Sequence, residues 1–259
     1  VKAAAVVIDN SSAFRMDPEV PLVVPEVNPQ AILKHKGIIA NPNCSTIIMV
    51  MALKPIYDLA KIKRVIVSTY QAVSGAGKEG IDELDAQVRE HSEGREMTAN
   101  ILPSASAEKH YPIAFNLIPQ IDVFCDNLYT KEEMKMVNET KKIMEDYEMR
   151  ITATTIRVPV YRSHSESVNI ELEKEVDLGA MREALAKFPG VTVQDDPSKQ
   201  EYPMPLYTSE KDDVYVGRLR RDESCEKSYN MWVVGDQIRK GAALNTLQIA
   251  ETMIKNGWI

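Results

Sequence analysis

The most constraining feature of the sequence is an unbroken apolar run, Ile-Ile-Met-Val-Met-Ala-Leu, at residues 47–53. It follows directly on Asn-Pro-Asn-Cys-Ser-Thr at residues 41–46, which supplies the polar side chains that begin helices. Together the two segments predict a buried helix over residues 45–61. Cys44 then lies where unpaired backbone N–H groups and the helix dipole favour a thiolate over a thiol. We therefore expect Cys44 to be a nucleophile rather than a core cysteine.

Composition narrows the class of protein. The chain has 259 residues, and 44% apolar with 27% charged residues is typical of a globular protein of one large domain or two interlocked ones. A formal charge of −7 argues against a nucleic-acid or anionic-membrane partner. The three cysteines are odd in number and far apart, which indicates free thiols in a reducing compartment. With no leader-like N-terminus and no apolar run near the ~20 residues that span a bilayer, we expect a cytoplasmic protein.

Helical and strand patterns alternate along the chain, and its middle is rich in hairpin signals. This order indicates an α/β core fused to an α+β domain. The pattern at 168–173 has an apolar residue at every second position, as expected for a half-exposed antiparallel strand. Thr130 and Glu133 form a capping box that begins a helix. The predicted strands are 3–8, 20–24, 38–40, 65–71, 151–160, 168–173, 214–219 and 231–234; the predicted helices are 45–61, 79–90, 130–146, 177–187 and 242–255, and residues 91–120 are loop-like.

Residues 75–80 match the pattern G-x-G-x-x-G, after a predicted strand and before a predicted helix. A dinucleotide-binding turn also needs a second strand that ends in Asp or Glu about 20 residues later, to hold the ribose. Here that region, residues 96–100, has no strand before it. We therefore interpret the glycines as a tight turn that lets the backbone approach a ligand, and not as the main nucleotide site.

Arg157 and His164 flank a short segment that contains Pro159. In a continuous strand their odd separation would place them on opposite faces. Pro159 and the polar residues 162–163 break the ladder, so a bend can bring both side chains into one cleft. A nucleophilic thiolate needs a nearby titratable base, which favours pairing His164 with Cys44. The alternative is a strand-end arginine and an unrelated loop histidine; the other histidines match no metal-site spacing.

Four more polar residues are candidates for a functional site. Gln71 ends a predicted strand, where a glutamine is usually a surface hydrogen-bonding residue. Glu132 and Lys135 lie three residues apart on one helix face, and a solvated ion pair is the favoured interpretation. Arg15 follows the end of the first strand, where anions bind in open α/β sheets, and its planar guanidinium suits phosphate.

Taken in order, these segments resemble the aspartate-β-semialdehyde dehydrogenase family across essentially the whole chain. Each segment alone is moderately specific, and their shared order carries the resemblance. The segments are residues 7–16, similar to the family's phosphate-binding stretch; 41–46, similar to its nucleophile motif; 70–77, 132–135, 156–160 and 164–167; and 235–243, similar to its C-terminal signature.

The resemblance implies an enzyme that interconverts aspartate β-semialdehyde plus phosphate with β-aspartyl phosphate, using NADP. It would serve the pathway to lysine, threonine, methionine and diaminopimelate, as a homodimer or homotetramer. It implies Cys44 as the nucleophile, His164 as the acid/base and Gln71 as the residue that orients the covalent intermediate. The other implied contacts are Arg157 with the substrate carboxylate, Glu132 with its amine, Arg15, Asn43 and Lys135 with phosphate, and Ser74, Gly75 and Asn245 with the cofactor.

The sequence departs from the family at one place. The family begins with a glycine-rich first βα turn that cradles the cofactor pyrophosphate, and this sequence has none. It starts at what would be a late strand of that domain, so we expect at least two βα units, roughly 60 residues, to be absent from it. The expected fold is α/β: a partial Rossmann-type cofactor domain, residues 1–41 and 240–259, plus an α+β catalytic and dimerisation domain with a mixed sheet, residues 42–239.

Three alternative functions stay open on the sequence. The nearest is N-acetyl-γ-glutamyl-phosphate reductase, but Ser45 and Thr46 after the cysteine differ from the aromatic and proline residues typical of that family. Its acetylated substrate would also have less use for Glu132. The second is a Cys-His hydrolase, which needs no nicotinamide. The third is a non-catalytic fragment that retains only the dimer-forming domain.

Overall fold

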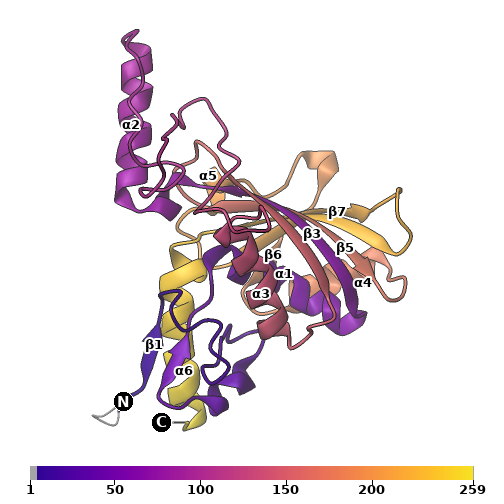
Figure 1. The fold of residues 1–259 in the computed structure, drawn as a ribbon. Helices are drawn as coiled ribbons and strands as arrows, with labels where there is room; N and C mark the ends of the chain where they lie inside the picture. Colours follow the sequence, from indigo (N-terminus) through magenta and orange to yellow (C-terminus); the bar gives the residue numbers. More distant parts are fainter. Residues whose placement is uncertain (1–4, 259) are drawn as a thin grey trace.

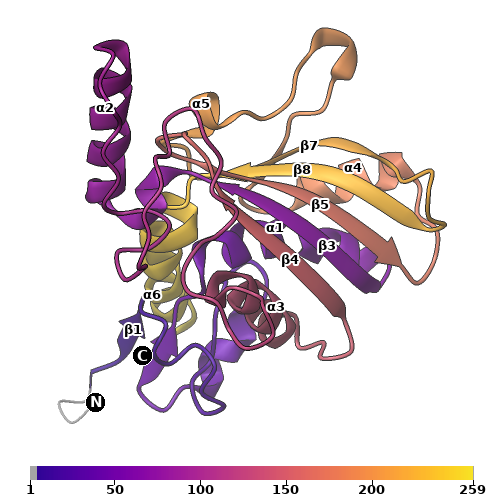
Figure 2. The same ribbon diagram turned by 45° about the horizontal axis from the view of Figure 1, so that its top comes forward.

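The computed structural model, which describes residues 5–258, has a two-layer α/β architecture (Figure 1). The strands of its main sheet are β3 (Ile62–Gln71), β4 (Arg150–Arg157), β5 (His164–Leu172), β6 (Val191–Val193), β7 (Val214–Arg221) and β8 (Ser228–Gly235), and the helices beside it are α1 (Cys44–Leu59), α3 (Lys131–Met144) and α4 (Leu178–Lys187). The sheet is mixed, with the order β4-β3-β5-β8-β7-β6. The three helices pack against one of its faces (Figure 2). The predicted α/β class with a mixed sheet is therefore confirmed.

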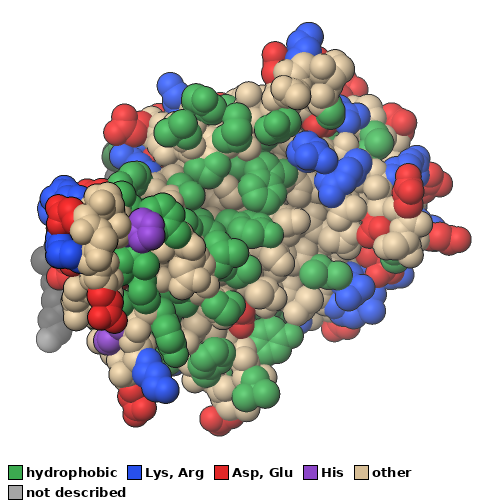
Figure 3. All heavy atoms as spheres, turned by 90° about the horizontal axis from the view of Figure 1, so that it is seen from above, with side chains coloured by type: hydrophobic (Ala, Val, Ile, Leu, Met, Phe, Trp, Pro, Cys, Tyr) green, Lys and Arg blue, Asp and Glu red, His purple; other side chains and the backbone are tan. Residues whose placement is uncertain are grey.

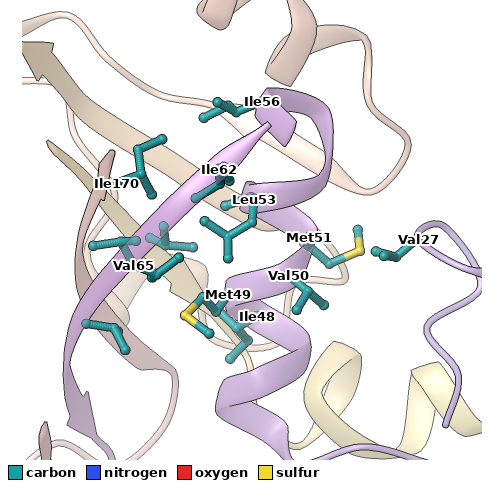
Figure 4. Close-up of a cluster of buried hydrophobic side chains, with 14 of the residues drawn as sticks. Val27, Ile48, Met49, Val50, Met51, Leu53, Ile56, Ile62, Val65 and Ile170 are labelled. Atoms are coloured by element: carbon teal, nitrogen blue, oxygen red, sulfur yellow. The ribbon is translucent and has the colours of Figure 1, made fainter. Parts of the chain in front are cut away.

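Helix α1 is the centre of the core. It starts at Cys44, and Asn43 is its N-cap, because the Asn43 Oδ1 accepts hydrogen bonds from the backbone N–H groups of residues 45 and 46 at 3.1 and 3.2 Å. Residues 47–53 are at most 1% exposed. Leu53 lies beside Ile62 of β3, whereas Met51 points to Val27 on the opposite side (Figure 4). The predicted buried helix is confirmed, one residue earlier at its start and two residues earlier at its end.

A smaller unit lies beside the N-terminus of α1. Strand β1 (Val7–Asp9) pairs in parallel with β2 (Ile38–Ala40), and α6 (Leu244–Asn256) packs against this pair (Figure 1). The helix predicted at 242–255 and the strand predicted at 38–40 are confirmed. Of the strand predicted at 3–8, residues 3 and 4 lie outside the described residues. The core of this unit consists of Val23, Ile32, Ile39, Ile249 and Met253.

The strand predicted at residues 20–24 is wrong. This segment is buried, but it forms only one isolated bridge, at Leu22. Pro21 has no backbone N–H to donate. The Asn28 side chain accepts a hydrogen bond from the Val24 N–H at 2.9 Å and donates one to the Leu22 carbonyl at 2.9 Å. These bonds satisfy backbone groups that a strand would offer to its neighbour, so the segment packs as an irregular chain.

Helix α2 (Lys78–Ser92) projects away from the sheet (Figure 1). The long segment that follows it, residues 93–130, has only isolated bridges; the prediction that residues 91–120 are loop-like is confirmed from residue 93 onward. Gln87 ties this segment to the helix, because its Oε1 accepts hydrogen bonds from the backbone N–H groups of Ile113 and Ala114 at 2.8 and 3.0 Å. A second apolar cluster supports the same junction; it consists of Val73, Leu84, Leu102, Ile113, Ala114 and Ile118.

The remaining sequence predictions hold with shifted boundaries. The capping box of Thr130 and Glu133 is present at the start of α3, and alternate residues of β5 are buried from Val168 onward. Strand β4 ends at Arg157, before Pro159. The short strand β6, of only three residues, was not predicted from the sequence. Across residues 5–258, we find no helix with both the length and the apolar character needed to cross a membrane.

Candidate active site

Strand pairing places three of the predicted site residues side by side. Gln71, the last residue of β3, pairs with Arg157, the last residue of the parallel strand β4. His164 begins β5, which runs antiparallel to β3, and the pairing of Tyr70 with Ser165 sets His164 beside Gln71 on the other side. All three side chains are at most 3% exposed. The same edge of the sheet therefore carries an amide, a guanidinium and an imidazole.

The backbone of Ala72 fixes two of these groups. Its N–H donates to the His164 Nδ1 at 3.0 Å, and its carbonyl accepts from the Arg157 Nη1 at 2.7 Å. Because Nδ1 accepts, the proton of the neutral ring is on Nε2. Burial and the nearby Arg157 charge hold the pKa of His164 well below its usual value, so the ring is neutral. Sequence reasoning missed Ala72, since a backbone contact leaves no side-chain signal.

Gly75 lies against both Arg157 and His164, and the absence of a side chain at this position leaves room for them. A Cβ at this position would lie 2.7 Å from the Arg157 Nη1 and 3.2 Å from the His164 Cε1. The bend predicted between residues 157 and 164 is thereby confirmed. The glycine turn of residues 75–80 admits these side chains, and Gly77 has the positive φ of 83° that glycine tolerates.

We expect Gly75→Ala to impair substrate binding much more than folding. The added methyl group would push the Arg157 guanidinium off the Ala72 carbonyl, so KM for the substrate should rise about 10- to 100-fold, while overpacking costs about 1 kcal/mol of unfolding free energy. Steady-state kinetics and thermal unfolding measure the two effects. Gly179→Ala is the matched control, because its Cβ would meet only the tip of Asp177. Equal KM values for the two variants would contradict this account of Gly75.

Cys44 lies at the start of α1, partly exposed, with the backbone of Gly241 packed against it: a Cβ on Gly241 would be 2.9 Å from the Cys44 Cβ. Burial, and next the charge of Glu132, raise the pKa of the Cys44 thiol to about 12, although Arg157 and the Ser45 backbone act in the opposite direction. In this structure burial therefore favours the thiol over the predicted thiolate. Desolvation outweighs the helix N-terminus, so a nucleophilic role would require Cys44 to lose its proton.

Glu132 is the hub of the polar network next to Cys44. It is 5% exposed, and it accepts hydrogen bonds from the Asn43 Nδ2 at 2.9 Å, the Gln71 Nε2 at 3.2 Å and the Lys135 Nζ at 3.2 Å. Lys135 also donates to Asp122 at 3.0 Å. The ion pair favoured on the sequence is therefore present, but it is not the solvated pair predicted: the Glu132 end is buried, because the first turn of α3 is packed against α1 and the sheet.

Arg15 reaches the same network from the N-terminal unit. Its Nε donates to the Asn41 carbonyl at 2.9 Å, its Nη2 to the Asn10 carbonyl at 3.1 Å and its Nη1 to the Glu139 Oε1 at 3.3 Å. Sequence reasoning missed Glu139. A signal was present, since Glu139 is seven residues after Glu132 and so shares its face of α3.

The three residues expected at the cofactor differ in which of their hydrogen-bonding groups the protein already uses. Ser74 and Gly75 lie in a 3-10 turn, and Gln237, another residue that the sequence did not single out, donates to the Ser74 Oγ. Asn245 is fully buried, and its Nδ2 donates to the Val23 carbonyl at 3.0 Å and to the Asn41 Oδ1 at 2.7 Å. Gly75 therefore lies against Arg157 and His164, whereas the amide donors of Asn245 are committed to the protein.

Comparison with known proteins gives two family matches. The model described as semialdehyde dehydrogenase, dimerisation domain, matches residues 53–240. The model described as semialdehyde dehydrogenase, NAD binding domain, matches residues 1–35. Together they cover most of the chain.

Individual relatives carry consistent names. Aspartate-semialdehyde dehydrogenase of Aquifex aeolicus is 56% identical over 260 residues, which is 100% of this chain and 75% of that protein. The Bacillus subtilis protein of the same name is 53% identical over 98% of this chain and 74% of its own length. The structure of aspartate semialdehyde dehydrogenase II from Vibrio cholerae matches with a TM-score of 0.92 and 47% identity over 98% of this chain and 74% of that one, and so does its complex with ASA.

Proposed function

The chain belongs to the aspartate-semialdehyde dehydrogenase family, and from this premise we propose that it reduces β-aspartyl phosphate to aspartate β-semialdehyde through a thioester on Cys44, with NADP as the cofactor. The observation that carries the proposal is the grouping of His164, Gln71 and Arg157 at one edge of the sheet, with Cys44 at the start of α1 close enough to Arg157 to feel its charge. An acyl-phosphate reduction needs a nucleophile, a proton donor and a cationic carboxylate site in one place. Cys44, the Nε2–H of His164 and the Arg157 guanidinium are groups of these three kinds.

Cys44 and His164 would both act on the reacting carbonyl group. In the oxidation direction, the Cys44 sulfur adds to the aldehyde carbon and the thiol proton passes to the carbonyl oxygen, giving a thiohemiacetal. NADP, when bound, supplies the acceptor for the hydride. Because Nε2 of His164 already carries a proton and Nδ1 accepts from the Ala72 N–H, His164 would donate a hydrogen bond to the reacting oxygen, and the hydroxyl proton would pass to solvent as the carbonyl forms again, which leaves a thioester on Cys44. In the biosynthetic direction the Nε2–H of His164 donates to that oxygen; this nitrogen is buried and has no partner within the described residues.

The polar network would hold the substrate. Arg157 keeps free N–H groups, including an Nε with no partner within residues 5–258, and we assign it to the substrate carboxylate. Glu132, a buried carboxylate, is assigned to the substrate amine. Gln71 lies between them and would orient the acyl group. Phosphate would bind among Arg15, Asn43 and Lys135, of which two are cationic.

The cofactor assignment rests on the family and on the turn at Ser74 and Gly75. A nicotinamide held by this turn would lie next to His164, because Gly75 has no side chain between them. The match of an NAD binding domain model to residues 1–35 supports a nicotinamide cofactor; NADP rather than NAD is our proposal. A contribution of Asn245 would come through its backbone or through Asn41, since its Nδ2 is occupied.

A homodimer or homotetramer is proposed from the open face of the sheet. Tyr70 of β3 and Trp232 of β8 lie in contact there, with ring centroids 5.5 Å apart, and apolar side chains are spread over the face seen from above (Figure 3). The match to a dimerisation domain model supports burial of this face between subunits. We retain residues 42–239 as the catalytic and dimerisation domain, with residues 1–41 and 240–259 in the cofactor domain, and a cytoplasmic role in lysine, threonine, methionine and diaminopimelate biosynthesis.

The proposal is tested by measuring NADPH formation from aspartate β-semialdehyde by the full-length protein. We expect formation to depend on both inorganic phosphate and NADP. Turnover of the N-acetyl-γ-glutamate semialdehyde in preference to aspartate semialdehyde would favour the related reductase. Turnover without phosphate or nicotinamide would favour a Cys-His hydrolase, and no turnover by a folded protein would favour a non-catalytic role.

A further inference from the structure

We propose that Glu139 is a positioning residue that couples phosphate binding at Arg15 to the uptake of a proton and to the placement of the segment that begins the Cys44 helix. The inference rests on the proposed function, because it takes phosphate to be the ligand of Arg15. Nothing in the reaction itself requires a second carboxylate on this face of α3. Glu139 is nevertheless 1% exposed and contacts both Arg15 and the backbone of Asn43.

Each oxygen of Glu139 has a different partner. Oε1 accepts from the Arg15 Nη1 at 3.3 Å, and Oε2 accepts from the Asn43 backbone N–H at 2.6 Å. Asn43 is the N-cap of α1 and the residue before Cys44. One buried carboxylate therefore links the guanidinium expected to hold phosphate with the backbone that places the nucleophile.

The hydrogen bonds of Arg15 leave room for phosphate only beside this carboxylate. Nε is used by the Asn41 carbonyl, and each terminal nitrogen gives one N–H to a protein acceptor. The free donors are then the second N–H groups of Nη1 and Nη2. A phosphate that accepts from them would lie close to Oε1, so two anions would share one guanidinium. Like charges at such a distance favour the neutral form of the carboxyl.

The surroundings of Glu139 already bring its titration close to neutrality. Burial raises its pKa to about 7; Arg15 and the Asn43 N–H oppose this, and the charge of Glu132 adds to it. Lys142, also close enough to feel the Glu139 charge, is engaged with the carbonyls of residues 15, 17 and 20. An arriving phosphate would thus find a carboxyl group that can accept a proton at physiological pH.

The affinity for phosphate should fall as pH rises. If phosphate binds only when Glu139 is protonated, the affinity of the protein for phosphate is full below pH 7 and decreases above it. The KM for phosphate should then rise about tenfold between pH 6 and pH 8, with little change in kcat. Above pH 7, binding should take up about one proton.

The test compares the wild type with Glu139→Gln and with Glu83→Gln. Glutamine at 139 keeps an acceptor for the Asn43 N–H and does not titrate. Glu83 is a matched control, a buried carboxylate on α2 that accepts two backbone N–H groups away from the site. Proton uptake is measured by titrating inorganic phosphate calorimetrically in buffers of different ionisation enthalpy, and KM for phosphate is measured from pH 6 to pH 8. Inorganic phosphate itself titrates in this pH range, so the contribution of Glu139 is read from the difference between the wild type and each variant.

We expect Glu139→Gln to lose about one proton of uptake at pH 8 and to flatten the KM profile, while Glu83→Gln behaves as the wild type. Identical profiles for all three proteins would overturn the inference and leave the proposed function standing. Absence of phosphate-dependent turnover in the wild type would instead overturn the function. If Glu139→Gln does not fold, sulfate, an anion that does not titrate here, decides the matter in the wild type: sulfate binding without proton uptake overturns the inference, and binding with it supports the inference.

Discussion

Replacement of Cys44 by serine should lower kcat for phosphate-dependent NADPH formation by at least about 10³-fold. A serine hydroxyl is a far weaker nucleophile than a thiol or thiolate, and its pKa is much higher, so it stays protonated at neutral pH. The fold should survive, because Cys44 contributes no hydrogen bond to the N-cap that Asn43 provides. Steady-state kinetics and thermal unfolding of the purified variant give both results.

Cys125→Ser and Cys225→Ser are the controls for this substitution. Both cysteines are free thiols outside the site, so each variant should keep the wild-type rate. Retention of more than about a tenth of the activity in Cys44→Ser, or a comparable loss in either control, would remove Cys44 from the role of nucleophile.

Replacement of His164 by asparagine should lower kcat by about 10²- to 10³-fold, the usual contribution of one hydrogen-bond donor to the reacting oxygen. Asparagine places its Oδ1 near the position of Nδ1, so the hydrogen bond from the Ala72 N–H is kept at this position and the Nε2 donor is lost. The loss should therefore fall on kcat, with a smaller change in KM.

His164→Gln is the complementary variant, since its amide reaches the position of Nε2 but loses the bond to Ala72. It should keep a donor near the reacting oxygen and so exceed His164→Asn in rate. His91→Asn, at a histidine whose ring contacts Phe115 away from the site, should leave the rate unchanged. A rate for His164→Asn within threefold of the wild type would show that the Nε2 donor does not act on the reacting oxygen.

Local signals predicted the elements that depend on nearby residues. The start of α1 was readable because Asn43 caps its own helix and the apolar run follows at once. The capping box at Thr130 and the alternation in β5 depend in the same way on residues a few positions apart. The predicted strand at 20–24 failed because the Asn28 side chain took the hydrogen bonds of the Leu22 carbonyl and the Val24 N–H, which left only a single bridge to β2.

Electrostatic predictions failed where burial decides the outcome. Sequence spacing identified the pair of Glu132 and Lys135 but not that α1 and the sheet bury the Glu132 carboxylate. For the same reason the helix N-terminus suggested a thiolate at Cys44, whereas desolvation raises the pKa of the thiol. Ala72 and Glu139 act through tertiary contacts, with partners up to 124 residues away in sequence, and such contacts exist only in the folded chain.

The central claim is that Cys44 holds an acyl group between hydride transfer and phosphate transfer. The most direct test is peptide mass spectrometry of the full-length protein after incubation with aspartate β-semialdehyde and NADP in the absence of phosphate. We expect the mass of an aspartyl acyl group on the peptide that contains Cys44, and its disappearance on addition of phosphate with release of β-aspartyl phosphate. An unmodified Cys44 peptide under conditions that form NADPH, or an acyl group on another residue, would contradict the account.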